Sequence, residues 1–263
     1  MTTNKVTSAD GTLIAYELLG SGSSVVVVGG ATCDRARMSG VSTELARHHA
    51  VVNYDRRGRG ESGDTAPYEV AREVEDLAAL IADVGGSAAL YGHSSGAALV
   101  LHALAAGLPV TRAVLHEPPY ASADMVAGSR EYAASLASLL EAGRHDDALA
   151  LFFTITGLPS SMVSAWRAEP WWPAVAALAP TLAYDSAVMG HPTGGTVPLD
   201  LARAATAPAL VLVGGASPDW MLDTDRTLAE AMPAGQLRVL AGEGHVVEPP
   251  VLVPVLTEFL SAR

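Results

Sequence analysis

The fold of this chain is decided by the segment SAALYGHSSGAALVLHALAA, residues 87–106. Residues 87–91 form an apolar run typical of a buried strand, and residues 97–106 have the alanine-rich and leucine-rich composition of a helix. Between them lies the pattern Gly-x-Ser-x-Gly, with Ser94 at its centre. A chain with this glycine and serine content carries the pattern by chance in roughly one or two cases in ten, so the flanking strand and helix give it its meaning.

A serine at a sharp turn from a strand into a helix is the arrangement expected of a nucleophile. Such a turn strains the backbone of Ser94 and exposes its hydroxyl above the sheet. Side chains two residues before or after would collide with neighbouring backbone, which explains Gly92 and Gly96. The N–H of Ser95 starts the helix, where free donors and the helix dipole favour a developing oxyanion. The alternative is a glycine-rich connection in which the serine has no chemical role.

Strand-like runs alternate with helical patterns on both sides of this segment, which indicates an α/β fold with a mostly parallel sheet. The predicted strands cover residues 6–9, 13–18, 25–28, 50–54, 87–91, 112–116, 209–213 and 237–240, and the predicted helices cover residues 68–84, 97–106, 223–232 and 254–260. The first two strands flank Asp10-Gly11, a strong tight-turn pair. We therefore expect one domain over residues 1–263, with about eight strands flanked by helices.

Residues 118–199 break the alternation and are predicted to form a helical lid insertion. They hold eight of the fourteen aromatic residues, among them Phe152, Trp166, Trp171 and Trp172. One interpretation is that these rings form the core of the insertion. The other is that some of them line an apolar pocket beneath a lid, which makes these four residues candidates for substrate binding. Both interpretations can hold at once.

The candidate base is found among eight histidines. A serine hydroxyl is a weak nucleophile until an adjacent imidazole removes its proton. His245 ends the sequence AGEGH, residues 241–245, in a flexible loop between the last predicted strand and the last helix. That loop is expected at the same sheet edge as Ser94, so we predict that His245 is the base. His93, next to the nucleophile, is expected to point away.

Composition excludes several classes of function. The net charge of −12 argues against nucleic-acid binding, which needs a basic surface. The single cysteine, Cys33, excludes an internal disulfide and fits a reducing compartment. Residues 1–5 lack an apolar leader, and no apolar run approaches the ~18 residues of a membrane span, so a cytoplasmic protein without membrane contact is expected. We see no metal-ligand cluster or phosphate loop, and expect neither a metal nor a cofactor.

Taken together, these motifs resemble the α/β-hydrolase superfamily, in its small bacterial esterase-like branch, over nearly the whole chain. The likeness is carried by Asp10-Gly11, Gly29-Gly30, the block DRRGRGES at residues 55–62, the segment around Ser94, and residues 242–245. The resemblance implies acyl transfer, in which Ser94 attacks a carbonyl carbon. We expect the N–H groups of Ser95 and Ala31, the latter after the strand at residues 25–28, to form the oxyanion hole. Gly29 departs from the family, which often has histidine there.

The acid that orients the imidazole has two candidates. Counting back from His245, the usual acid position of the family falls on Ser217, and Asp219 lies two residues later. Some members of the family instead carry the acid at the end of the preceding sheet strand, where this chain has Glu117. Either carboxylate could stabilise the protonated imidazole, and Asp223 and Asp225 are weaker alternatives.

The expected substrate is a small molecule: a small or medium ester, lactone or thioester with an apolar acyl part. The aromatic content and low charge of residues 118–199 favour this hypothesis. Alternatives that keep the same triad are hydrolysis of a C–C bond, cofactor-free perhydrolysis and a biosynthetic tailoring step. A ligand sensor without enzymatic activity is a further alternative. Dehalogenases and epoxide hydrolases of this superfamily use an aspartate nucleophile, so the serine at position 94 argues against both.

Overall fold

The computed structural model describes residues 3–262 and contains a central sheet of eight strands in the order β1-β2-β4-β3-β5-β6-β7-β8. The strands are β1 (Asn4–Thr7), β2 (Leu13–Gly20), β3 (Ser24–Val28), β4 (Ala50–Tyr54), β5 (Ala88–His93), β6 (Val110–His116), β7 (Ala209–Gly214) and β8 (Gly235–Leu240). The pairs β1–β2 and β2–β4 are antiparallel, and the remaining pairs are parallel. The mostly parallel sheet predicted from the sequence is confirmed.

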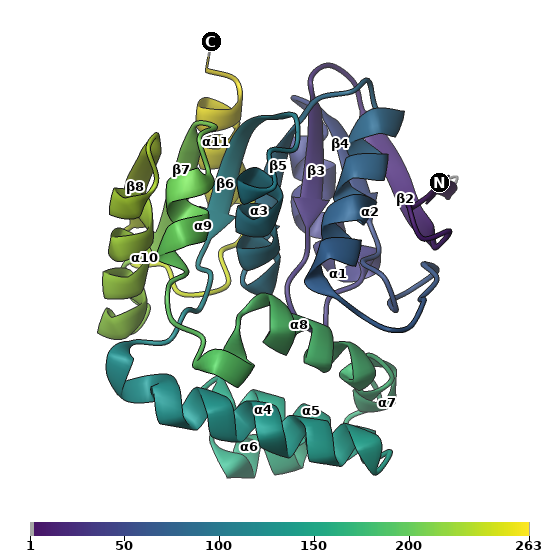
Figure 1. Cartoon of the computed structure of the whole chain (residues 1–263), viewed down its shortest axis with the longest axis vertical. Helices are drawn as coiled ribbons and strands as arrows, with labels where there is room; N and C mark the ends of the chain where they lie inside the picture. Colours follow the sequence, from purple (N-terminus) through teal and green to yellow (C-terminus); the bar gives the residue numbers. More distant parts are fainter. Residues whose placement is uncertain (1–2, 263) are drawn as a thin grey trace.

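Helices cover both faces of the sheet (Figure 1). One face carries α1 (Arg35–Leu45) and α11 (Pro249–Leu260), which contact each other, and the opposite face carries α2 (Val70–Asp83), α3 (Ser95–Ala105), α9 (Leu199–Ala204) and α10 (Asp219–Ala231). The strand β3 shows why two layers are needed. Val26 and Val28 enter the apolar core on one face and Val25 and Val27 the core on the other, because successive side chains of a strand point in opposite directions.

Helix α3 lies at the centre of the molecule and is apolar on every side. Its residues from Ser95 to Leu101 are all buried, because the sheet lies on one side and α2, α8 (Leu182–Val188) and α9 on the others. A helix that is apolar all round is stable in a soluble protein where it is fully enclosed. The buried position of α3 fixes the start of the helix, and hence the place of Ser94, which directly precedes it.

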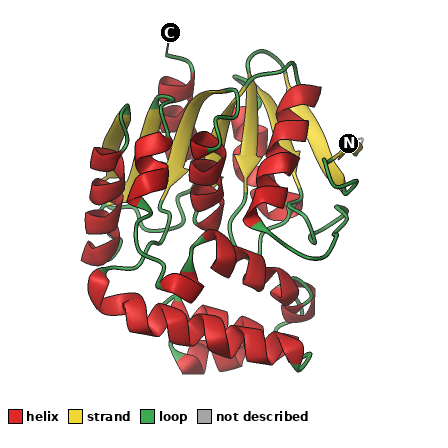
Figure 2. Cartoon of the chain, in the orientation of Figure 1, coloured by secondary structure: helices red, strands yellow, loops and turns green. Residues whose placement is uncertain are grey.

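The chain between β6 and β7 contains a group of helices, residues 123–193, which we call the helical insertion. It comprises η1 (Ala123–Met125), α4 (Val126–Glu141), α5 (His145–Ile155), α6 (Ser160–Trp166), α7 (Trp172–Ala176), η2 (Ala179–Thr181), α8 (Leu182–Val188) and η3 (His191–Thr193). Figure 2 shows this layer as helices and loops beyond one edge of the sheet. It has an apolar core of its own, centred on Leu136, Leu149 and Leu182, and Ala31 packs against that core.

Several helices were not predicted from the sequence, or begin at other residues than predicted. Helix α1 was not predicted, because its few buried apolar positions are separated by polar and small residues. Helix α9, six residues long, was not predicted either. Helix α10 begins at Asp219 and not at 223, so Asp219 belongs to a helix rather than to a turn. Helix α11 begins at Pro249, where proline is tolerated in the first turn, and Pro254 lies inside it.

Among residues 3–262, no helix combines the length and the apolar character that crossing a bilayer requires.

Two glycines with nearly equal, positive φ provide a test of the packing. Gly20 and Gly107 have φ values of 71° and 74°. A Cβ at Gly20 would collide with the carbonyl oxygens of Ala46 and His49, whereas one at Gly107 would meet nothing within 4 Å. Gly107→Ala should therefore lower the free energy of unfolding by about 1 kcal/mol, the cost of a left-handed alanine. Gly20→Ala should cost about 3 kcal/mol, because backbone must also move. Urea unfolding of both variants measures the difference, and equal losses would contradict the described packing.

Candidate active site

Ser94 lies at a sharp turn between β5 and α3. Its backbone angles are φ 58° and ψ −127°, and its N–H donates to the His116 carbonyl oxygen at 2.8 Å. Thr32, Ser94 and Glu117 are the non-glycine residues with positive φ in the described part of the chain, 3–262. Such backbone strain persists where the surrounding structure enforces it, and it concentrates at functional sites.

The glycines around Ser94 are required by close approaches of backbone. A Cβ at Gly92 would lie 2.5 Å from the Gly96 carbonyl oxygen, and one at Gly96 would collide with the Val28 carbonyl oxygen. A Cβ at Gly30 would lie 2.9 Å from the Cβ of Ser94. The loop that follows β3 therefore rests directly against the serine.

The carboxylate of Glu117, at the end of β6, holds the imidazole of His245. Nδ1 of His245 lies 2.6 Å from Oε2 of Glu117, and the other oxygen, Oε1, accepts from the Gly214 N–H and the Ser217 hydroxyl, both at 2.6 Å. The Glu117 side chain is fully buried, whereas 38% of the His245 side chain is exposed. Because Nδ1 donates to the carboxylate, Nε2 of the neutral ring is the nitrogen that can accept a proton.

The environment of Glu117 favours its ionised form. Burial raises the pKa of a carboxyl group, but the hydrogen bonds from His245, Ser217 and Gly214 outweigh burial here and hold the pKa of Glu117 below its usual value. An ionised acceptor of this kind fixes the orientation of the imidazole and stabilises the imidazolium that forms during proton transfer.

The structure brings Glu117 to His245 and does not bring Asp219 there. Asp219 is exposed at the start of α10, and no hydrogen bond of its side chain occurs within residues 3–262. Asp223 pairs with Arg226 at the surface. Asp225 is buried, and its pKa is raised to about 9 by burial and by nearby Glu117. Ser217, at the position where the family usually has its acid, instead donates to Glu117.

His93 does not point away from the site, so that expectation was wrong. Its Nε2 lies 2.8 Å from the His245 carbonyl oxygen, and the two rings have their centroids 4.7 Å apart. Burial, followed by the proximity of His245, lowers the pKa of His93 to about 4, so the ring is neutral at pH 7 and Nε2–H donates. This bond anchors the loop of His245 to the residue before Ser94. Within residues 3–262 no hydrogen bond joins the Ser94 hydroxyl to the His245 ring.

The two candidate oxyanion donors are the N–H groups of Ser95 and Ala31. Ser95 is the first residue of α3, so its N–H has no partner within the helix. Ala31 follows Gly30 in the loop that touches the serine, and its N–H makes no backbone hydrogen bond within the described chain. Both donors are thus free to bind an anionic oxygen.

The four aromatic residues proposed for substrate binding lie in the helical insertion. Trp172 is buried, and its Nε1 donates to Asp146 at 2.6 Å, while Trp171 is 39% exposed. Trp166 and Phe152 pack against the core of the insertion. These contacts fit the interpretation as a helical core. Ala31, a candidate oxyanion donor, packs against the same core. A role of these four aromatic residues in substrate binding therefore stays a prediction.

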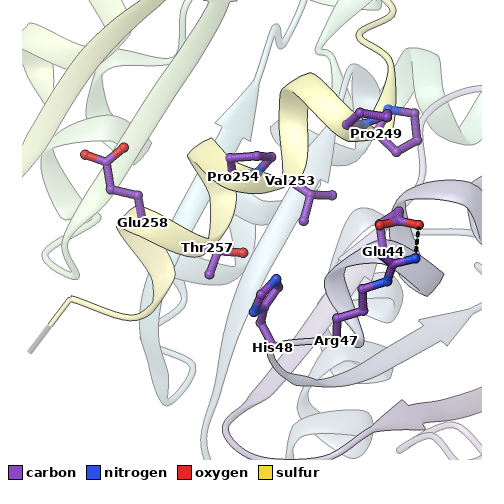
Figure 3. A pocket seen from close by; sticks show the side chains of 9 residues that line it. Glu44, Arg47, His48, Pro249, Val253, Pro254, Thr257 and Glu258 are labelled. Atoms are coloured by element: carbon purple, nitrogen blue, oxygen red, sulfur yellow. Dashed lines mark ion pairs between the residues drawn. The ribbon is translucent and has the colours of Figure 1, made fainter.

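One hollow on the surface lies apart from the candidate catalytic residues. A groove of about 370 Å³ lies between α11 and the end of α1. Figure 3 shows side chains that line it, including His48, Pro249 and Val253. None of the candidate catalytic residues contributes to its lining. As for metals, residues 3–262 contain no group of three or more His, Cys, Asp or Glu side chains able to hold an ion.

Comparisons with known proteins agree with this fold. The model of a family described as the alpha/beta hydrolase family matches residues 14–254. The crystal structure of an alpha/beta hydrolase from Sphaerobacter thermophilus DSM 20745 is similar, with a TM-score of 0.86 and 45% sequence identity. That similarity covers 97% of this chain and 99% of the other.

More distant relatives share the fold or a part of the sequence. A hydrolase from Pseudomonas aeruginosa PA01 has a TM-score of 0.75 at 20% identity, covering 99% of both chains. The esterase RhEst1 from Rhodococcus sp. ECU1013 has a TM-score of 0.68 at 23% identity, covering 100% of this chain and 99% of the other. At such identities the similarity concerns the fold alone. The uncharacterized hydrolase YraK of Bacillus subtilis (strain 168) is 34% identical over 106 residues, which span 38% of this chain and 39% of that relative.

The hydrogen bonds of Glu117 predict a pH-dependent contribution to stability. Because the pKa of Glu117 is lowered from 4.5 in the folded protein, its stabilising effect is present above that value and is lost as the pH falls through the folded-state pKa. Glu117→Gln should therefore lower the free energy of unfolding by about 2 kcal/mol at pH 7, the worth of charged hydrogen bonds. The difference from wild type should shrink as the pH is lowered from 4.5 through the folded-state pKa. Urea unfolding across this pH range measures it, and a constant difference would contradict the assignment.

Proposed function

We propose a function from the premise that this chain belongs to the alpha/beta hydrolase family, as the match over residues 14–254 shows. The predicted resemblance is thereby confirmed, and the chain is a hydrolase. The proposed reaction is cleavage of a small or medium carboxylic ester, lactone or thioester with an apolar acyl part, through an acyl-enzyme on Ser94. The observation that carries this proposal is the 2.6 Å hydrogen bond between His245 and Glu117, beside a serine with strained backbone.

In the proposed first half-reaction, Oγ of Ser94 attacks the substrate carbonyl carbon while Nε2 of His245 removes the hydroxyl proton. The carbonyl oxygen becomes an oxyanion, which the N–H groups of Ala31 and Ser95 stabilise. The bond from the carbonyl carbon to the leaving oxygen or sulfur then breaks, and the imidazolium returns its proton to that atom. The buried carboxylate of Glu117 stabilises the imidazolium throughout.

The second half-reaction regenerates the serine. Water gives a proton to His245 and attacks the acyl carbon, and the same two N–H groups hold the second oxyanion. The bond between the acyl carbon and Oγ breaks, and Ser94 regains its proton from the imidazolium. His93, which anchors the His245 loop through the backbone carbonyl oxygen, supports this role by keeping the base next to the nucleophile.

The preference for an apolar acyl group rests on the neighbours of the oxyanion loop. Ala31 packs against the core of the helical insertion, to which Leu139, Phe152 and Trp166 also contribute. An acyl chain that extends from the carbonyl carbon would contact this apolar side of the site. Burial of each methylene group there would add about 0.8 kcal/mol to binding. We propose that the insertion acts as a lid over the acyl chain.

The nucleophile is tested by covalent labelling and by ester hydrolysis. Wild-type protein should form a stable adduct with a fluorophosphonate at Ser94 and should hydrolyse p-nitrophenyl esters, with kcat/KM rising over the first few added methylene groups. Ser94→Ala should abolish labelling and lower kcat by at least about 10⁴-fold, because the covalent step is lost. Mass spectrometry locates the adduct. A folded wild-type protein that neither reacts with the probe nor cleaves any ester would refute the proposed function.

The acid is tested with a pair of carboxamide variants. Glu117→Gln should lower kcat by about 10³-fold or more, because the imidazole loses its orienting anion. Asp219→Asn is the matched control, since that side chain is exposed and the carboxylate bonded to His245 is that of Glu117, and it should retain kcat within a factor of about two. Steady-state kinetics on one ester gives both values. Equal activity of the two variants would show that Glu117 does not serve the imidazole.

A further inference from the structure

Four buried charged residues connect the helical insertion to the candidate oxyanion hole. Arg56, Arg59, Glu73 and Asp185, which we call the charge cluster, are each 4% exposed or less. Their two positive and two negative charges cancel. Burying ion pairs costs as much desolvation energy as it returns in attraction, and apolar residues of similar size would be about as stable. Such a cluster is therefore better explained by what it positions than by the stability it contributes.

One arm of the charge cluster holds the loop that carries Ala31. The guanidinium of Arg59 donates from NH1 to the Gly30 carbonyl oxygen at 2.6 Å and from NH2 to both carboxylate oxygens of Asp185, at 2.8 and 2.9 Å. The peptide bond from Gly30 to Ala31 is trans, so its C=O and N–H point in opposite directions. A guanidinium that holds the carbonyl oxygen on one side therefore fixes the direction of the Ala31 N–H on the other.

The preceding peptide of the loop is held in the same way. Arg56 donates from NH1 to the Gly29 carbonyl oxygen at 3.2 Å and to Asp185 at 2.7 Å, while its Nε and NH2 form a paired interaction with Glu73. Two successive carbonyl groups of the oxyanion loop thus accept from buried arginines. The residue at position 29, where the family often has histidine, is held here by Arg56 through its carbonyl oxygen.

The second arm of the charge cluster reaches the other oxyanion donor. The hydroxyl of Ser95 donates to Oδ1 of Asp185 at 2.7 Å. The backbone N–H of the same residue is the second candidate donor, so Asp185 anchors that residue directly and Ala31 through Arg59. Asp185 itself lies in α8 of the helical insertion, where its neighbour Tyr184 stacks on Tyr68 with ring centroids 3.8 Å apart. The Tyr68 hydroxyl donates to Glu73, which closes the network.

We infer that Asp185 is a positioning residue for both halves of the oxyanion hole, an inference that rests on the proposed function. It holds the Ala31 N–H through Arg59 and the Gly30 carbonyl oxygen, and it holds the Ser95 N–H through the Ser95 hydroxyl. Loss of its charge leaves two buried guanidinium groups short of an acceptor, and both donors lose their fixed direction. The helical insertion therefore contributes to the chemical step, in addition to covering the substrate.

The test compares two buried aspartates that each pair with an arginine of the block at residues 55–62. Asp185→Asn removes the proposed anchor. Asp76→Asn is the matched control. Asp76 is also buried and accepts two hydrogen bonds from Arg57, of 2.8 and 2.7 Å. Arg57, however, makes no hydrogen bond to the loop of Gly30 in the described structure. Both variants should unfold at a lower temperature than wild type, since Asp185→Asn leaves the buried Arg59 without a carboxylate partner and Asp76→Asn leaves Arg57 with Asp10 alone.

The two variants should separate in their kinetics at a temperature where both are folded. Asp185→Asn should lower kcat by about 10- to 100-fold with little change in KM, because displaced donors weaken binding of the transition state more than of the ester. Its affinity for an alkylboronic acid, whose tetrahedral serine adduct places an oxygen at the donors, should fall by a similar factor. Asp76→Asn should keep kcat and boronate affinity close to wild type.

Ser95→Ala provides a second test, because it removes one hydroxyl and retains the N–H. It should lower kcat and boronate affinity about threefold to tenfold. If Asp185→Asn does not fold, this variant tests the inference in its place.

Wild-type kcat and boronate affinity in Asp185→Asn, or in Ser95→Ala where the first variant does not fold, would overturn the inference. An equal fall in Asp76→Asn and Asp185→Asn would overturn it too, because the effect would then follow from lost stability. These results are distinct from a failure of the proposed function, in which the wild-type protein itself neither cleaves esters nor binds the boronic acid.

Discussion

The site depends on one buried carboxylate that cannot be left without hydrogen-bond donors. Glu117 directly follows β6 in a place without access to water, and an ionised group there is tolerated because three donors surround it. Those donors come from the end of β7, from the turn that follows it, and from the loop after β8. By satisfying one anion, the chain joins the carboxyl ends of three neighbouring parallel strands and gives His245 a fixed orientation.

Much of this arrangement could be predicted because its signals are local. The turn around Ser94 is marked by a strand, two glycines and a helix within twenty consecutive residues, and His245 is marked by its place between the last strand and the last helix. The acid could not be chosen in this way. The choice between Glu117 and Asp219 depends on where α10 begins, and that helix begins four residues before the predicted start at 223, which carries Asp219 to the surface.

Contacts between distant parts of the chain could not be predicted from local sequence patterns. The arginines of the block at residues 55–62 were visible in the sequence, but Asp185 lies 126 residues from Arg59, in a short helix of an irregular segment. His93 was expected to point away, since a residue beside the nucleophile gives no sign of a partner 152 positions later. The aromatic residues of the insertion were ambiguous for a different reason, because the same rings can pack a helical core and border a pocket.

The unusual backbone of Ser94 has a consequence for attempts to make this protein more heat-resistant. Glycine adopts positive φ without strain, and no hydrogen bond of the Ser94 hydroxyl to the His245 ring occurs within residues 3–262, so Ser94→Gly would relieve roughly 1 kcal/mol of unfavourable conformation. A selection that rewards survival at high temperature alone would accordingly favour variants in which this serine is lost. Thermal stability and the proposed covalent step are in conflict at this position, and a library built for heat resistance should keep it fixed.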